Sequence, residues 1–160
     1  MWQYTLNPEL HLSEDLFRRY SEVFSHPPWI GTAFKGATSS CAQVPNIQHY
    51  VGNHLAWIAM INRLGITDLS GIVFTGWQRF DHFASLCELL PVSVPSLRCC
   101  LRALERKKFD EADANETFRE LGLTTDDGLA EFTNKFPGYD LYKVVVERFG
   151  TVEKWHHIEN

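Results

Sequence analysis

Hydrophobic positions along the first part of the chain follow two different spacings. Three short runs rich in apolar and aromatic residues have the length and composition of β-strands, at residues 2–6, 29–34 and 71–75. In the segments between these runs, apolar residues recur three or four positions apart. This spacing predicts amphipathic helices, so strand and helix alternate from the first strand onward.

Capping residues mark the ends of the two helices between these strands. Ser13 and Asn46 have side chains that accept hydrogen bonds from the free N–H groups of a first helical turn. Pro27 and Pro28 end the first helix, and Gly65 stands where a glycine closes the second. The buried stripe of the second helix is expected to comprise Ile47, Val51, His54, Ile58 and Ile61.

The third apolar run, "GIVFT" at residues 71–75, has no polar face, which is typical of a strand buried from both sides. A helix is expected to follow it and to end before Pro91, and Pro95 is expected to open another. Leu97, Cys100, Leu101 and Leu104 would form the inner face of that second helix. Further helices are expected near 113–121, 127–135 and 141–149, although "YKVVV" in the last of these segments could also be a strand.

Alternation of this kind predicts an α/β fold with parallel strands joined by right-handed crossovers. A small doubly wound sheet and a portion of a (β/α)8 TIM barrel both fit the pattern. A doubly wound sheet that binds a dinucleotide would carry a glycine-rich turn after its first strand, and none is present. In a barrel, functional residues gather at the carboxyl ends of the strands, where this chain places aromatic and charged residues.

Composition narrows the class of function. The chain has 160 residues, of which 44% are hydrophobic, and a formal net charge of −5. The negative charge and the lack of a long basic run argue against a nucleic-acid partner. No apolar stretch is long enough for a membrane span, and "MWQYTLNPEL" lacks the features of a signal peptide.

The cysteines predict neither disulfides nor a metal site. Cys99 and Cys100 are adjacent, which suits reduced thiols better than a disulfide framework. The zinc-ligand spacing C-x-x-C is absent, and His156–His157 are successive positions that do not face one ligand. We therefore expect no cofactor, no metal and a cytoplasmic or nuclear location.

A cluster of aromatic and charged residues follows the third strand in "FTGWQRFDH", residues 74–82. If the backbone stays extended, Trp77, Arg79 and Asp81 project to one side. An indole face packs on the C–H face of a pyranose, and charged groups bind its hydroxyls. The alternative is a structural Arg79–Asp81 ion pair with Trp77 as core packing. His82, like His54, is expected to be structural.

These residues also carry a resemblance. Together with "WQY" (2–4), "WIGTAFKGA" (29–37) and "CELLP" (87–91), the cluster resembles the C-terminal part of the hexosaminidase D-like β-N-acetylhexosaminidases of glycoside hydrolase family twenty. The resemblance covers roughly residues 1–105. It implies that residues 1–106 form the last three β/α units of a TIM barrel and that 107–160 form a helical C-terminal extension.

The resemblance also implies a function. Family members remove terminal N-acetylhexosamine from glycoconjugates, with the substrate's own acetamido oxygen as nucleophile. It implies that Trp77 closes the sugar pocket and that Asp81, with Arg79, contacts sugar hydroxyls. Trp2 and Tyr4 would line the same pocket. Lys35 follows the second strand, where family members often carry an acid or a tyrosine.

The family's catalytic residues are an adjacent Asp–Glu pair on the fourth barrel strand, and the resemblance places strands one to five outside these 160 residues. Glu14–Asp15 has the reverse order and begins a predicted helix, and Asp126–Asp127 lies in the tail. We therefore assign no catalytic residue and expect the chain to be inactive alone. The alternative is a non-catalytic sugar-binding or protein-interaction remnant that self-associates through open sheet edges.

Overall fold

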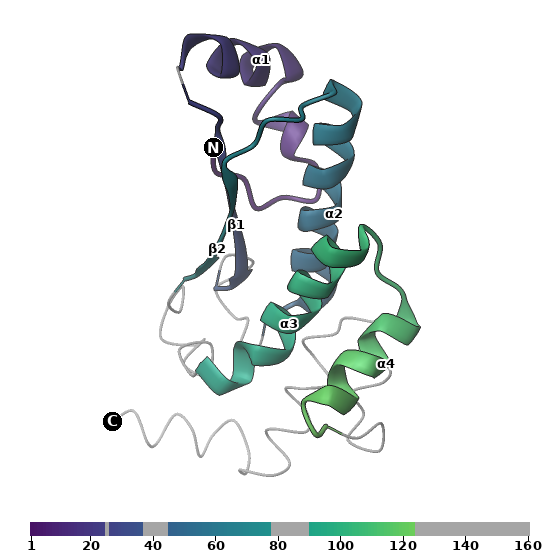
Figure 1. Ribbon diagram of the computed structural model, residues 1–160. Coiled ribbons are helices and arrows are strands. Elements are labelled where there is room, and N and C mark those ends of the chain that lie inside the picture. Colours follow the sequence, from purple (N-terminus) through teal and green to yellow (C-terminus); the bar gives the residue numbers. More distant parts are fainter. Residues whose placement is uncertain (25, 37–44, 78–89, 124–160) are drawn as a thin grey trace, which may run out of the picture.

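Two paired parallel strands and the helix that connects them along the chain form the centre of the molecule (Figure 1). The computed structural model describes residues 1–24, 26–36, 45–77 and 90–123. Strand β1 (Trp29–Lys35) pairs in parallel with β2 (Gly71–Gly76), and helix α2 (Ile47–Leu64) connects them. The predicted strand–helix–strand order is confirmed for this part of the chain, and the fold is mixed α/β.

The capping residues act as the sequence predicts. Helix α1 (Glu14–Val23) follows a short 3₁₀ helix (η1, Pro8–Leu10), and Ser13 Oγ accepts a hydrogen bond from the Leu16 N–H. Asn46 Oδ1 accepts from the N–H of His49 at the start of α2. Gly65 closes α2 with a φ of +64°, in the left-handed region that favours glycine.

The stripe predicted for α2 is correct in part. Ile47, Val51 and His54 are buried, but Ile58 and Ile61 are only half-buried. The stripe omitted five residues that the structure buries: Tyr50, Asn53, Trp57, Met60 and Leu64. The buried surface is wider than one stripe because α2 packs both against β1 and against another helix, α3 (Leu90–Arg106).

The predicted strand at residues 2–6 is wrong beyond Trp2, which forms a single parallel bridge with Gly31 of β1. The backbone carbonyls that follow accept hydrogen bonds from side chains of α2 instead of from a strand. Tyr4 O lies 2.7 Å from His49 Nε2, and Asn53 Nδ2 donates to Thr5 O at 2.5 Å. Trp57 Nε1 and Asn53 Nδ2 both donate to Gln3 O. Because His49, Asn53 and Trp57 stand four residues apart, they form one row on the helix.

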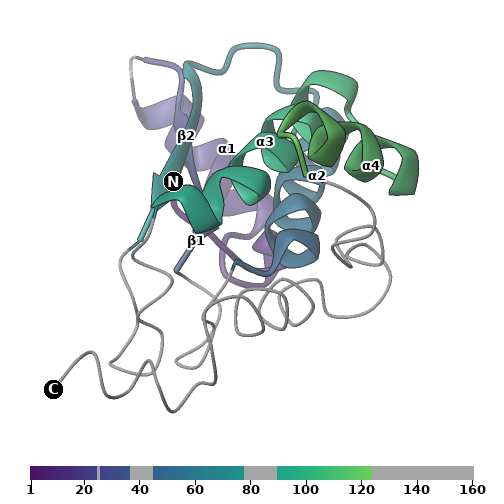
Figure 2. The same ribbon diagram turned by 90° about the horizontal axis from the view of Figure 1, so that it is seen from below.

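The prediction that residues 71–75 are buried from both sides is also wrong. β1 is buried from Ile30 to Lys35, whereas β2 is half-buried and Val73 is 39% exposed. Figures 1 and 2 show the reason: α2, α3 and α4 (Glu111–Glu120) gather on one side of the two strands, and no described element covers the other side.

Helix α3 (Leu90–Arg106) runs through both prolines, so the predicted break between Pro91 and Pro95 is wrong. Pro91 falls in the first turn, where the backbone N–H has no partner within the helix. The predicted inner face is correct for Cys100, but Leu97 and Leu104 are only half-buried and Leu101 is exposed. From residue 93 on, the other buried residues of α3 are Ser93, Pro95, Ser96, Cys99, Arg102 and Ala103.

Helix α4 (Glu111–Glu120) confirms the helix predicted near 113–121. Its Ala114 and Phe118 join one hydrophobic cluster with residues of β1, α2 and α3. A second cluster joins α1, β1 and α2 through Phe17, Ile30 and Trp57. The helices predicted before Pro91, near 127–135 and near 141–149 lie outside the described residues, Leu90 excepted.

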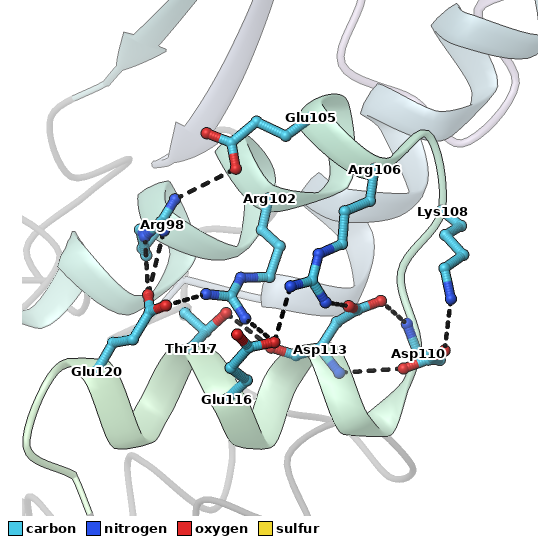
Figure 3. A network of polar contacts seen from close by, with 10 residues as sticks. All are labelled: Arg98, Arg102, Glu105, Arg106, Lys108, Asp110, Asp113, Glu116, Thr117 and Glu120. Carbon is cyan, nitrogen blue, oxygen red and sulfur yellow. Dashed lines mark hydrogen bonds and ion pairs between the residues drawn. The ribbon is translucent and has the colours of Figure 1, made fainter.

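Ion pairs join α3 to α4 along their length (Figure 3). Arg98, Arg102 and Arg106 occupy successive turns of α3 and pair with acidic residues of α4 in reverse order. Arg102 Nη1 lies 2.6 Å from a carboxylate oxygen of Glu116, and Arg102 also pairs with Glu120. The side chain of Arg102 is only 3% exposed, so this charge depends on its partners. The guanidinium of Arg102 also lowers the pKa of the Glu120 carboxyl.

Candidate functional site

Three of the predicted site residues form a chain of aromatic contacts beside β1 and the end of β2. The ring centroids of Trp2 and Tyr4 are 6.3 Å apart, and those of Tyr4 and Trp77 are 5.8 Å apart. Both pairs meet edge to face, at interplanar angles of 70° and 76°. Trp2 is 58% exposed and Trp77 is 47% exposed, so both indoles offer surface to a ligand.

Trp2 owes its position to the backbone of β1. Gly31 N donates to Met1 O at 2.6 Å, and Gln3 N donates to Gly31 O. A Cβ atom on Gly31 would lie 2.4 Å from two ring carbons of Trp2, so a side chain at residue 31 would displace the indole. The glycine therefore allows Trp2 to lie directly against the strand.

Tyr4 contacts both indoles, and residues of α2 and the core hold it in place. Its carbonyl is held by His49 of α2, and its ring packs against the cluster that contains Phe34 and Val51. The ring is half-buried, so Tyr4 is the inner member of the aromatic chain.

Trp77 is the first residue after β2, and the end of β1 holds its backbone. Its N–H donates to Lys35 O at 3.3 Å, and its carbonyl accepts a hydrogen bond from Lys35 Nζ at 2.6 Å. Lys35 is buried, with 6% of its surface exposed. No sequence pattern predicts this contact, because residues 35 and 77 meet only through the pairing of β1 with β2.

The charged half of the predicted site, Arg79 and Asp81, lies outside the described residues, as does His82. Their sugar contacts, and the alternative of a structural ion pair, therefore remain predictions.

His54 is a structural residue, as expected. Its Nε2 lies 2.8 Å from Thr32 Oγ1 and its Nδ1 lies 2.6 Å from Tyr50 O, while the ring stacks on Phe74 at 4.6 Å. Burial lowers its pKa to about 4, although the hydrogen bond to Tyr50 opposes this effect. His54 is therefore neutral at physiological pH.

One further adjacent carboxylate pair, Asp110–Glu111, was not predicted as a candidate, although it has the Asp–Glu order that the resemblance implies for a catalytic pair. The structure gives it a different role. Asp110 Oδ1 accepts from the Asp113 N–H at 3.0 Å, and Asp113 Oδ2 accepts from the Asp110 N–H at 3.0 Å. This capping box lowers the pKa of Asp110, chiefly through the hydrogen bond from the Asp113 backbone. The pair begins α4 and does not end a strand.

Glu14 and Asp15 also have structural roles at the start of α1. Glu14 pairs with Arg63 of α2 at 2.5 Å, and Asp15 pairs with Arg19 one turn later at 2.9 Å. Asp126–Asp127 lies outside the described residues.

A hollow of about 540 Å³ lies at the opposite, amino ends of the strands. It was not predicted, and it is bordered by α1, the N-terminal segment and the start of β1. Its lining is mainly apolar and includes Leu16, Tyr20, Phe24 and Trp29. Trp2 also borders it, so this indole lies between the hollow and the rest of the aromatic chain.

Within the described part of the chain, no group of three or more His, Cys, Asp or Glu residues is arranged to hold a metal ion. The same residues contain no helix with both the length and the apolarity that a membrane span requires.

Comparison with known proteins identifies relatives. The chain is 36% identical to human hexosaminidase D over 150 residues, which is 92% of this chain and 31% of that protein. It is 41% identical to hexosaminidase D of Bos taurus over 125 residues, which is 78% of this chain and 36% of that protein. The chain thus spans about a third of the length of these relatives. No protein-family model matches it.

Proposed function

Because the chain is a hexosaminidase D-like protein over most of its length, we propose that it supplies part of a pocket for terminal N-acetylhexosamine. The reaction that the complete pocket would serve is removal of this sugar from glycoconjugates by a β-N-acetylhexosaminidase. This proposal extends to the chain a function that the names of its relatives suggest.

The observation that carries the proposal is the aromatic chain of Trp2, Tyr4 and Trp77. Half-exposed indole faces pack on the C–H faces of pyranose rings, and Trp77 stands where β2 ends. In parallel α/β folds, ligands bind at the carboxyl ends of the strands.

We further propose that β1 and β2 are the last two strands of a (β/α)8 barrel and that Trp2 marks the strand before them. β1 lies between the Trp2 bridge on one edge and β2 on the other, and all the pairings are parallel. This is the order that three consecutive barrel strands would have. Residues 1–106 would then form the barrel portion and 107–160 the helical extension.

Arg79 and Asp81 complete the proposed site. They follow Trp77 at period two in the sequence, and in an extended segment they would reach the same side as the indole. Their proposed role is to bind sugar hydroxyls through charged hydrogen bonds.

The chain by itself would bind the sugar without hydrolysing it. Substrate-assisted hydrolysis needs one carboxylate to orient the acetamido group and one carboxylic acid to protonate the leaving oxygen. Asp110 is engaged in a helix cap, and Glu14 and Asp15 are paired with arginines. We therefore propose that this chain binds the sugar. The acid–base residues would belong to the two thirds of the relatives that have no counterpart in this chain.

Titration with N-acetylglucosamine, followed by tryptophan fluorescence, tests this proposal. We expect saturable binding, and we expect Trp77→Ala to weaken it about fivefold through the loss of ring stacking. Trp29→Ala is the matched control, since Trp29 is 56% exposed but borders the hollow at the amino ends of the strands. Equal losses from both variants, or no binding at all, would contradict the proposed site.

A chromogenic N-acetyl-β-glucosaminide tests the second half of the proposal. The chain is expected to release no chromophore above the level of an Asp81→Ala control. Turnover that depends on Asp110 and Glu111, shown by its loss in an Asp110→Asn, Glu111→Gln variant, would give these residues a catalytic role and refute the assignment to binding alone.

A non-catalytic interaction module is the second candidate function. The observation that favours it is the outer edge of β2, which pairs with no other strand among the described residues. Open edges of this kind accept a strand from another chain.

A further inference from the structure

We propose that Lys35 is a positioning residue that fixes the direction in which the chain leaves β2, and with it the orientation of the Trp77 indole. Its effect on sugar affinity rests on the proposed function, whereas its effect on Trp77 does not.

Two hydrogen bonds join residues 35 and 77. The Trp77 N–H donates to the backbone carbonyl of Lys35, which continues the pairing of the strands by one step. The Lys35 ammonium then donates to the Trp77 carbonyl at 2.6 Å. The second bond is charge-assisted and short, and it holds the peptide group immediately beyond the strand.

An irregularity in the sheet brings the lysine to this position. Ala33 is opposite Thr75, but Lys35 is opposite Gly76, so two residues of β1 advance for one of β2. Such a bulge turns the side chains that follow it. Here it brings the Lys35 stem across β2 toward the carbonyl of the next residue.

Gly76 leaves room for this crossing. A Cβ atom on Gly76 would lie 3.2 Å from Lys35 Cε and 2.8 Å from Phe34 Cζ. The lysine stem and the phenyl ring thus occupy the space that a side chain would need. Both Phe34 and Lys35 are buried, so the lysine stem is packed against protein atoms where it crosses the strand.

The bonds place Trp77 against Tyr4. Hydrogen bonds hold both the N–H and the carbonyl of Trp77. The Trp77 indole then meets the Tyr4 ring edge to face, with the ring centroids 5.8 Å apart. Without the ammonium, the Trp77 carbonyl would lose its buried donor and the peptide would turn to find another. The indole would then move away from Tyr4, although β1 and β2 would remain paired.

Fluorine NMR of the full chain labelled with 5-fluorotryptophan measures this effect directly. Trp77→Phe assigns the Trp77 resonance among those of the five tryptophans. We expect Lys35→Met to shift or broaden that resonance selectively and Lys35→Arg to restore it, since arginine keeps a charged donor. Lys108→Met removes an exposed lysine in the turn before α4 and is expected to leave the spectrum unchanged.

Measurements of sugar affinity then show whether Lys35 acts by positioning Trp77 or by contacting the sugar directly. If Lys35 acts through Trp77, Lys35→Met weakens N-acetylglucosamine binding about tenfold in the parent chain but less than twofold in a Trp77→Ala background. Equal losses in both backgrounds would show that the ammonium touches the sugar, and the proposal would be wrong.

The NMR result decides the proposal even if no sugar binds, because absence of binding refutes only the proposed function. A Trp77 resonance that does not change in folded Lys35→Met protein overturns the positioning role. Should Lys35→Met lose its far-ultraviolet circular dichroism, Lys35→Gln replaces it. This shorter neutral side chain is expected to produce the same change in the Trp77 resonance, and an unmoved resonance would again overturn the role.

Discussion

At the scale of single residues, His54 shows how burial determines the chemistry of a side chain. The imidazole has no exposed surface, and both ring nitrogens have oxygen neighbours within hydrogen-bonding distance. A proton added to this ring would place a charge in the core without a carboxylate partner in either of these contacts. Its lowered pKa follows from that cost and makes folding sensitive to mild acid.

The free energy of unfolding should therefore fall as the pH is lowered from about 6.5 to about 4. Over this range the unfolded chain binds a proton at His54 that the folded chain does not bind. This difference lowers the free energy of unfolding by about 3 kcal/mol in total. Below about pH 4 both states are protonated and this contribution no longer changes. Urea unfolding at a series of pH values measures it.

Two variants isolate the contribution of His54 from that of other groups. His54→Gln cannot titrate, so its stability profile should be flatter between pH 6.5 and 4 than that of the parent chain. His11→Gln removes an exposed histidine and should retain the parent's slope. Parallel profiles for the parent and His54→Gln would contradict the prediction.

At the scale of elements, the contact between α3 and α4 combines apolar packing with charge pairing. Phe118 and Ala114 of α4 enter the core, and Arg98, Arg102 and Arg106 of α3 form a row that pairs with acidic residues of α4 (Figure 3). Exposed ion pairs contribute little to stability, but a buried guanidinium must keep its partners. Arg102 is the buried member of this row, so the position of α4 should depend on it more than on any exposed pair.

Replacement of Arg102 by methionine should lower the free energy of unfolding by about 2 kcal/mol. The loss is smaller than for a fully buried pair because Glu116 and Glu120 remain partly solvated. Arg19→Met, which removes the exposed pair with Asp15, should cost less than about 0.5 kcal/mol. Equal urea midpoints for the two variants would show that α4 does not depend on Arg102.

At the scale of the whole molecule, helices α2, α3 and α4 lie on one side of the two strands (Figures 1 and 2). β2 therefore has an outer edge and a face that no described element covers, and Val73 is exposed there. A longer relative could supply a further strand at this edge. In this chain, a second copy is the partner that we expect.

Sedimentation equilibrium from low-micromolar to submillimolar concentration should show reversible self-association. Val73→Lys places a charge on the open strand and should shift the chain toward monomer. Val94→Lys is the matched control, since Val94 on α3 is 38% exposed, close to the 39% of Val73. A monomer at every concentration, or equal effects of the two lysines, would exclude association through β2.

The elements that the sequence predicted well are those set by local interactions. Ser13, Asn46 and Gly65 act on their own helix ends, so their roles follow from neighbours in the chain. The alternation of the first helices with β1 and β2 follows from periodicity for the same reason. Trp77 was chosen from the cluster that follows the third strand, and Trp2 and Tyr4 through the family resemblance. The structure brings the three rings together without testing their role.

Tertiary structure decided what depends on residues far apart in the chain. Residues 3–5 do not form a strand because side chains of α2 donate hydrogen bonds to their backbone carbonyls. One face of β2 is exposed because α2, α3 and α4 cover only the opposite face. The contact of Lys35 with Trp77 arises only once β1 and β2 pair with an irregular register. The sequence by itself determined the helix caps at Ser13, Asn46 and Gly65, because their hydrogen bonds close within a few residues. Burial and the shape of the site depend on which surfaces meet, so only the tertiary structure decided them.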